Sequence, residues 1–299
     1  MTWPEQVQIR EVGPRDGLQN EARFIPTASK IEWINQLSAA GFRYIEVTSF
    51  VSPKWIPQLS DAAVVAASIE RAQGVAYAAL VPNLRGLEQA VEAKIDEVAV
   101  FMSASETHNR KNINKPIADT FPVLSEVVRE AGSAGKTVRG YVSTVFGCPY
   151  EGKVELEQVI RVADKLLEMG VGEISLGDTI GAANPRQVQT TLEALLKRYP
   201  AEKLALHFHD TRGTALANIV VSMEMGIARF DASVGGLGGC PYAPGASGNA
   251  ATEDVVYCLR EMGIETGIDF GKLLSAAKYI QEKTGRTLPS RNLQAYFAV

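Results

Sequence analysis

Two histidines separated by one residue, His207 and His209, are the strongest chemical signal in the chain. They stand at the end of a strand-like apolar run, 204–208. Residues two apart on a strand point to the same side, so both imidazoles would face one point inside the fold. Converging imidazoles favour a metal site. A hydrogen-bonded pair of core histidines is the alternative interpretation.

Two hard oxygen donors stand where they could complete such a site. Asp16 follows the first predicted strand, and Asn249 follows the eighth. In a closed barrel these strands are neighbours, and the eighth also adjoins the strand of the histidines. Two imidazoles, a carboxylate and an amide with open positions suit six-coordinate Mg²⁺ or Mn²⁺ better than tetrahedral zinc. Taken singly, Asp16 could be a helix N-cap and Asn249 a helix start.

Four further residues at strand ends or in loops could take part in chemistry. Arg15 can donate a fork of hydrogen bonds to a carbonyl or carboxylate. Glu46 alternates with apolar neighbours, so it is expected to face the barrel interior and to pair with Arg15. Asp178 could orient Arg15 or ligand waters, and a structural polar role is equally open for Glu46 and Asp178. Cys240 lies in a glycine-rich loop, which favours an accessible thiol acting as acid, base or redox switch.

The elements that would position these residues alternate between strand and helix along almost the whole chain. Amphipathic stretches separate the strands, and several end at glycine, as at Gly41, Gly170 and Gly226. This order predicts a single α/β unit over residues 1–299, a (β/α)8 TIM barrel with additional helix over 270–299. An open doubly wound sheet is the alternative. The expected strands are Val7–Val12, Tyr44–Thr48, Gly74–Leu80, Glu97–Met102, Val138–Thr144, Glu173–Leu176, Leu204–Phe208 and Arg229–Val234.

The composition is that of an ordinary globular protein and limits its partners. The 299 residues carry a net charge of −4 with no basic stripe, so nucleic acid is not an expected partner. No apolar run has the length of a membrane span, and the first residues resemble no signal or transit peptide. Three cysteines are too few for a disulfide framework. Together these features predict a cytoplasmic protein.

Several sequence segments resemble the 3-hydroxy-3-methylglutaryl-CoA lyase family, within the metal-dependent barrel superfamily that also holds isopropylmalate, homocitrate and citramalate synthases. The resemblance runs from about Val7 to about Gly267, and the loop around Cys240 is the family's own signature. The segments that carry it are Val12–Glu21, Thr48–Trp55, Gly140–Ser143, Gly147–Gly152, Ser175–Gly181, His207–Thr211 and Gly236–Tyr242.

This resemblance implies a divalent-metal-dependent lyase that cleaves 3-hydroxy-3-methylglutaryl-CoA to acetoacetate and acetyl-CoA, in leucine degradation or ketone-body type metabolism. A homodimer is expected on the same grounds. The implied metal ligands are Asp16, His207, His209 and Asn249. The implied catalytic residues are Arg15, Cys240, Glu46, Asp178 and His207. We expect further contacts to the acyl-CoA substrate from Arg15, Gln19, Ser49, Lys111 and Asn112, the last two in a polar segment interpreted as a loop.

The chain departs from the family pattern at few positions. Gly235 stands where alanine is usual, Arg212 where tyrosine is frequent, and the sequence diverges after roughly Lys272. Arg212 could alter the charge of the site. The rival functions are a lyase for a related 3-hydroxyglutaryl-CoA, a condensing synthase or aldolase, an Fe(II) oxygen enzyme and a non-enzymatic barrel.

Overall fold

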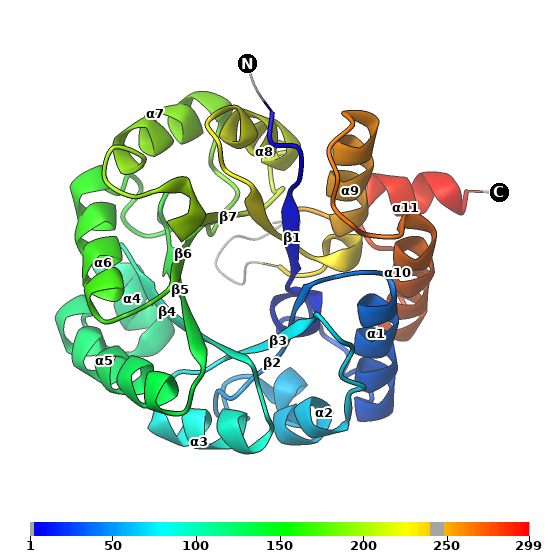
Figure 1. The fold of residues 1–299 in the computed structure, drawn as a ribbon, viewed down its shortest axis with the longest axis horizontal. Coiled ribbons are helices and arrows are strands. Elements are labelled where there is room, and N and C mark those ends of the chain that lie inside the picture. The colour runs from blue at the N-terminus through cyan, green and yellow to red at the C-terminus, as the bar shows by residue number, and fades with distance from the viewer. Residues whose placement is uncertain (1–2, 240–247, 299) are drawn as a thin grey trace.

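Eight parallel strands close into a barrel in the computed structural model, which describes residues 3–239 and 248–298. Each strand pairs with its neighbours in sequence, and β1 pairs with β8 to close the ring (Figure 1). The predicted TIM barrel is therefore confirmed, and the predicted strand ends lie within two residues of the observed ones. The strands are β1 Gln8–Glu11, β2 Tyr44–Ser49, β3 Ala76–Leu80, β4 Glu97–Ser103, β5 Thr137–Ser143, β6 Glu173–Asp178, β7 Leu204–Phe208 and β8 Arg229–Ala232.

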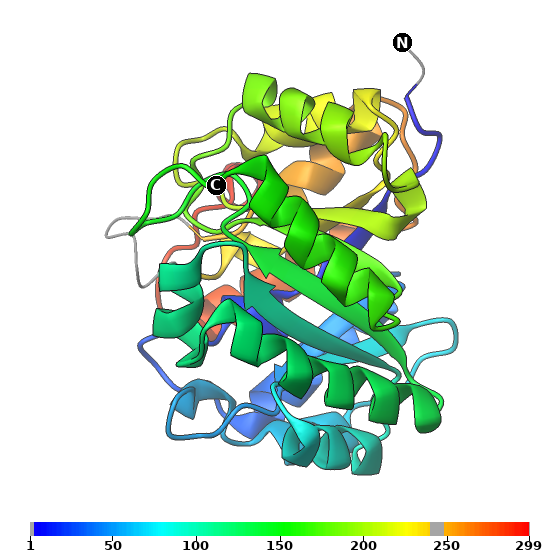
Figure 2. The ribbon, with the colours of Figure 1, turned by 90° about the vertical axis from the view of Figure 1, so that its left-hand side faces the viewer.

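Helices cover the outside of the barrel, as the side view shows (Figure 2). The last two lie beyond the eighth strand, and α10 packs against α1, so the predicted additional C-terminal helices are present. The helices are α1 Thr27–Ala39, α2 Ala62–Ser68, α3 Leu84–Glu92, α4 Glu106–Ile113, α5 Ile117–Ser133, α6 Leu156–Glu168, α7 Pro185–Leu195, α8 Ala215–Glu224, α9 Thr252–Glu261, α10 Phe270–Thr284 and α11 Arg291–Tyr296.

The hydrophobic core lies between the strands and the helices, not along the barrel axis. On β7, Leu204, Leu206 and Phe208 are buried on the outer face, as their alternation predicts. They belong to one large apolar cluster with helix residues such as Ile219. Full burial of one such side chain contributes about 2 kcal/mol, so this layer supplies most of the stabilisation of the fold.

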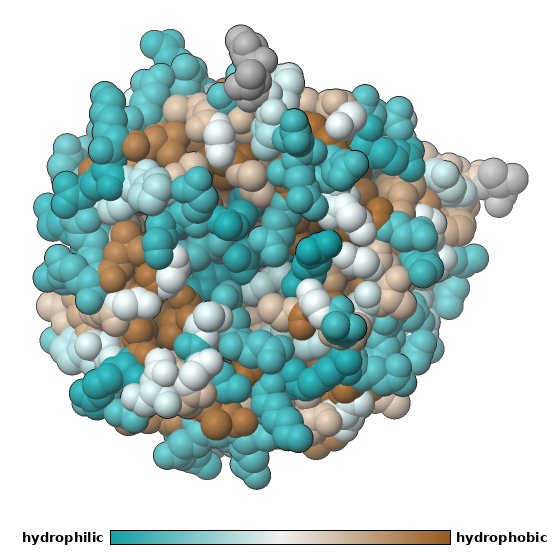
Figure 3. Space-filling view, in the orientation of Figure 1, coloured by the Kyte–Doolittle hydropathy of each residue, from teal (hydrophilic) through white to brown (hydrophobic). Residues whose placement is uncertain are grey.

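The barrel interior, by contrast, is filled largely with charged and polar side chains. Arg139 on β5 is fully buried and pairs with Glu173 on β6 and Asp231 on β8. Arg10 on β1 pairs with Glu173 and with Glu97 on β4. Hydrophilic residues also gather at the centre of the face seen in Figure 3. The interior therefore offers a polar scaffold on which charged functional groups can be held.

One predicted loop is a helix. The polar segment after β4 forms α4, because Ser105 caps it by accepting a hydrogen bond from the His108 backbone N–H at 3.1 Å. His108 and Asn109 are buried on the inner side of this helix. The loop interpretation was wrong because capping and burial of two polar residues outweighed the low apolar content. Across the described residues, no helix is long and apolar enough to cross a membrane.

Candidate metal centre and active site

The histidine pair lies inside the barrel, at the carboxyl ends of the strands. His207 is on β7, and His209 follows that strand and forms a bridge with Asn249. The Nε2 atoms of His207 and His209 are 3.2 Å apart, and His207 Nε2 is 3.9 Å from Asp16 Oδ2. One potential ligand atom from each of Asp16, His207 and His209 lies within 4.8 Å of the others. Asp16, which follows the first strand, therefore lies beside the two histidines at the end of the seventh strand.

This geometry fits a six-coordinate divalent ion. Two ligands about 2.1 Å from one ion and at right angles to each other are roughly 3 Å apart, which matches the separation of the two Nε2 atoms. Asn249 Nδ2 donates to Asp16 Oδ2 at 2.8 Å, whereas Asn249 Oδ1 is buried without a partner among the described residues. A buried oxygen of this kind needs a donor or a cation. All four predicted ligands therefore lie together.

A glycine makes room for this arrangement. Gly238 has φ of +110°, and a Cβ added there would lie 2.6 Å from Asn249 Nδ2. Both the backbone conformation and the close approach require glycine. This explains at least one of the glycines in the loop that follows β8.

Two of the candidate ligands are in the ionisation state that a metal needs, a carboxylate and a neutral imidazole. Burial alone would raise the pKa of Asp16, but the Arg15 guanidinium and the two imidazoles outweigh it and hold that pKa at about 2. Burial, reinforced by the neighbouring His207, lowers the pKa of His209 to about 4. At neutral pH the Asp16 carboxylate is therefore ionised and the His209 imidazole is neutral.

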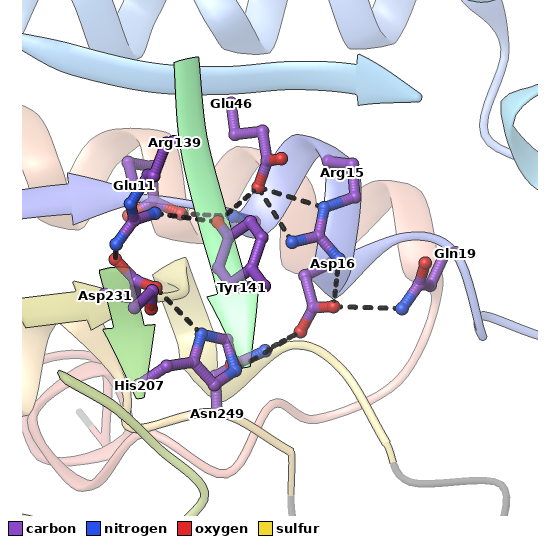
Figure 4. A network of polar contacts seen from close by, with 12 residues as sticks. Glu11, Arg15, Asp16, Gln19, Glu46, Arg139, Tyr141, His207, Asp231 and Asn249 are labelled. Carbon is purple, nitrogen blue, oxygen red and sulfur yellow. Dashed lines mark hydrogen bonds and ion pairs between the residues drawn. The ribbon is translucent and has the colours of Figure 1, made fainter. Parts of the chain in front are cut away.

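Arg15 lies beside these ligands on the five-residue π-helical turn Gly13–Gly17, which directly follows β1. Its Nε and Nη2 donate to Glu46 Oε2 at 3.0 and 2.8 Å, and its Nη1 donates to Asp16 Oδ1. The predicted Arg15–Glu46 pair is present. Because Arg15 is buried and held on two sides, its guanidinium is a fixed positive charge next to the candidate metal ligands (Figure 4).

Sequence reasoning missed the residues that link these groups. Tyr141 donates to Glu46 Oε2 at 2.9 Å and accepts from Arg139 at 2.8 Å. Asp231 accepts from Arg139 and lies 3.1 Å from His207 Nδ1 (Figure 4). A signal was available: each of these polar residues alternates with apolar residues within a buried strand, which is the pattern that identified Glu46.

The predicted substrate-binding residues fall into two groups. Gln19 donates to Asp16 Oδ1 at 2.9 Å, and Ser49 is buried at the end of β2. Lys111 and Asn112 are exposed on α4, where Lys111 Nζ lies 5.0 Å from the Tyr150 ring centre. Gln19 thus contacts a candidate metal ligand, Ser49 lies at the carboxyl end of β2, and the other two lie on the surface of a helix.

The remaining predicted residues have different outcomes. Asp178 accepts from the backbone N–H groups of Ala182 and Ala183 at 2.9 and 3.1 Å, so its carboxylate holds the loop after β6 and does not orient Arg15. Burial raises its pKa to about 6. Arg212 donates to the carbonyls of Ile180 and Gly181. Cys240 lies outside the described residues.

Glu11 is a further buried carboxylate that supports the site from outside the barrel. Its Oε1 accepts from the Gly13 and Val234 N–H groups at 2.8 and 3.0 Å, and its Oε2 accepts from the Thr252 hydroxyl at 2.6 Å. It thereby ties together the turn that carries Arg15, the segment after β8 and the start of α9. Burial raises the pKa of Glu11 to about 7.

The replacement Glu11→Gln is expected to remove the loss of stability that ionisation of Glu11 causes as the pH rises from 4.5 to about 7. Between pH 4.5 and 7 the unfolded chain ionises Glu11 while the folded protein keeps the proton, so stability falls as pH rises through this window. The amide can preserve the three hydrogen bonds. The unfolding free energy of the variant minus that of the parent protein should rise by roughly 3 kcal/mol from pH 5 to pH 8. Urea denaturation at both pH values measures this.

Glu224, an exposed glutamate on α8, provides the matched control. The replacement Glu224→Gln should leave the pH dependence of unfolding as in the parent protein. If the unfolding free energies of the Glu11→Gln and parent proteins changed equally with pH, the raised pKa assigned to Glu11 would be contradicted.

The fold and the site define a class: a (β/α)8 barrel with a candidate metal site of two histidines, a carboxylate and an amide. The HMGL-like family model matches residues 6–280, and the chain belongs to this family. It is 64% identical over 296 residues to the hydroxymethylglutaryl-CoA lyase YngG of Bacillus subtilis, covering 99% of both chains. It is 51% identical over 294 residues to the mitochondrial hydroxymethylglutaryl-CoA lyase of Bos taurus, covering 98% of this chain and 90% of the relative.

Solved structures agree with these relationships. The crystal structure of Bacillus subtilis HMG-CoA lyase matches with a TM-score of 0.98 and 64% identity, covering 99% of both chains. An HMG-CoA lyase from Acinetobacter baumannii in complex with coenzyme A and 3-methylmalate matches with a TM-score of 0.94 and 43% identity, covering 99% of this chain and 96% of that one. The predicted family resemblance is confirmed over nearly the whole chain.

Proposed function

We propose that this protein cleaves 3-hydroxy-3-methylglutaryl-CoA to acetoacetate and acetyl-CoA. The observation that carries the proposal is the position of the Arg15 guanidinium, which lies against Asp16 and so beside the His207–His209 pair. A carbon–carbon lyase of this kind needs a cation at the hydroxyl to be deprotonated and a second positive charge where the enolate forms. Full-length similarity to hydroxymethylglutaryl-CoA lyases supports the same substrate.

The four candidate ligands Asp16, His207, His209 and Asn249 would hold Mg²⁺ or Mn²⁺. The bound ion would supply Lewis acidity, lowering the pKa of the tertiary hydroxyl of the substrate. Asp16 and His207 are the two candidates among these residues for the base that removes the hydroxyl proton, and each can act only through a lone pair that the ion leaves free. Asp231 and Gln19 hold these two groups in place through hydrogen bonds.

Arg15 would act at the other end of the breaking bond. After the hydroxyl proton leaves, the carbinol carbon becomes the ketone of acetoacetate, and the bonding electrons move to the thioester as an enolate. Arg15 stabilises the enolate oxygen, because negative charge appears there only as the bond breaks. Its ion pair with Glu46 fixes the guanidinium in advance. The enolate carbon then takes a proton to give acetyl-CoA, and Cys240 is the proposed donor or the shield against water.

The finer assignments form part of the same proposal. Gln19, Ser49, Lys111 and Asn112 would contact the acyl-CoA, and Asp178 would support the site through its loop. We also propose a cytoplasmic homodimer that acts in leucine degradation. The family membership and the acidic net charge of −4 support a small-molecule substrate instead of nucleic acid.

Anaerobic turnover of 3-hydroxy-3-methylglutaryl-CoA tests the function. Metal-stripped protein is assayed for acetoacetate with and without Mg²⁺ or Mn²⁺. We expect acetoacetate only when a divalent ion is added, and the same rate without oxygen, which would exclude Fe(II) oxygen chemistry. Folded protein that forms no acetoacetate with either ion would contradict the proposal and favour a related acyl-CoA or a condensing reaction.

A further inference from the structure

Asp231 contacts the Nδ1 atom of His207, on the side of the imidazole away from the other candidate ligands. It is on β8 in register with His207 on β7, so both side chains enter the barrel at one level. The side chain of Asp231 is fully buried. Its Oδ1 accepts from the Arg139 guanidinium, and its Oδ2 accepts from the Ser175 hydroxyl at 2.9 Å and lies 3.1 Å from His207 Nδ1.

These contacts leave His207 Nδ1 only one favourable role. An ionised carboxylate has no proton to donate, so a hydrogen bond between Asp231 Oδ2 and His207 Nδ1 requires the imidazole to carry its proton on Nδ1. The Nε2 atom then has a free lone pair, and it faces Asp16 and His209 at 3.9 and 3.2 Å. The strength of the Arg139–Asp231 ion pair holds the carboxylate in this orientation.

We propose that Asp231 is a positioning residue that fixes His207 as the Nδ1–H tautomer and thereby presents its Nε2 lone pair to a divalent ion. The inference rests on the proposed metal site. Carboxylate partners of this kind orient histidine ligands in metal centres generally. A role as mere counter-ion of Arg139 would leave the tautomer of His207 unaffected, so the two roles can be separated.

The replacement Asp231→Asn should reverse the tautomer. Arg139 offers only donors, so the amide oxygen of the new side chain will turn toward the guanidinium, and the NH₂ group will face His207 Nδ1. An N–H donor there requires an unprotonated Nδ1 and places the proton on Nε2, where it blocks the metal. Wrong-tautomer substitutions of this type leave geometry intact while removing function.

The test uses the full chain labelled with ¹⁵N in histidine. The chain has three histidines, and a His108→Gln spectrum identifies the third, so the ring signals of the pair can be assigned. Long-range ¹H–¹⁵N spectra of the metal-free protein at about pH 8, where a histidine is usually neutral, report the tautomers. We expect Nδ1–H at His207 in the parent protein, Nε2–H in Asp231→Asn, and an affinity for Mn²⁺ lowered about 10- to 100-fold by calorimetry.

The replacement Ser175→Ala is the matched control, because it removes a hydrogen bond from the same Asp231 oxygen without adding a donor. It should keep the parent tautomer and an affinity within about threefold. An Nε2–H tautomer at His207 in the parent protein would overturn the inference, even if Asp231→Asn failed to fold. An unchanged tautomer in folded Asp231→Asn would do the same. Neither spectrum depends on turnover, so the tautomer inference and the proposed reaction can each fail without the other.

Discussion

Replacing Arg15 with methionine is expected to lower kcat by about 10³-fold, while the affinity for Mn²⁺ changes far less. Loss of one fixed donor to a developing oxyanion typically costs 10²- to 10³-fold, and Arg15 carries a full charge in a buried site. Asp16 keeps its hydrogen bonds from Gln19 and Asn249, so the candidate ligand stays oriented. Steady-state kinetics with 3-hydroxy-3-methylglutaryl-CoA and Mn²⁺ calorimetry separate the two effects.

The Arg15→Met variant also leaves Glu46 buried without its cation, and breaking such a pair costs on the order of 3 kcal/mol of stability. The double variant Arg15→Met with Glu46→Gln restores neutrality and controls for this effect. Its melting temperature should recover while its kcat stays low. Near-normal turnover in Arg15→Met would rule out the enolate assignment for Arg15.

Replacing Asp16 with asparagine is expected to abolish turnover at any practical metal concentration. Asp16 is the only anionic group among the four candidate ligands, and its removal leaves two neutral imidazoles and two amides to hold a divalent cation. Substitution of groups that merely orient a ligand costs 10- to 100-fold in metal affinity, so loss of the charged ligand should cost more than about 100-fold. Mn²⁺ calorimetry and acetoacetate formation measure both effects.

Asp210 offers a matched control, because it adjoins His209 in sequence while its Oδ1 accepts from the Ala215 N–H at 2.9 Å. The replacement Asp210→Asn keeps an oxygen for that hydrogen bond and should retain Mn²⁺ affinity. Tight Mn²⁺ binding by Asp16→Asn would remove Asp16 from the ligand set.

Local periodicity was enough to predict the barrel and the inward-facing pair His207 and His209, whereas the full ligand set with Asp16 and Asn249 came from the family resemblance. Strand alternation places His207 inside, and the closed topology makes the ends of β1, β7 and β8 neighbours. The Arg15–Glu46 pair followed from the same reasoning, since an inward carboxylate needs a cation.

The second layer of contacts could not be predicted in the same way. Which acceptor reaches His207 Nδ1 depends on strand register, and the register His207↔Asp231 is set by barrel closure instead of by any local motif. For Asp178 the sequence leaves a role in the site and a structural role equally open, because it does not show that the backbone N–H groups of Ala182 and Ala183 are partners of the carboxylate. The loop prediction for the α4 segment was wrong for a related reason, because the Ser105 cap and the burial of His108 and Asn109 outweigh its low apolar content.

The pairing of β1 with β8 has a consequence for biogenesis. A chain leaving the ribosome exposes Asp16 before His207, His209 and Asn249 have been synthesised. The four candidate metal ligands therefore come together only when β8 has docked beside β1. An ion bound by these four residues would be loaded only after the barrel has closed, and it would stabilise the closed barrel.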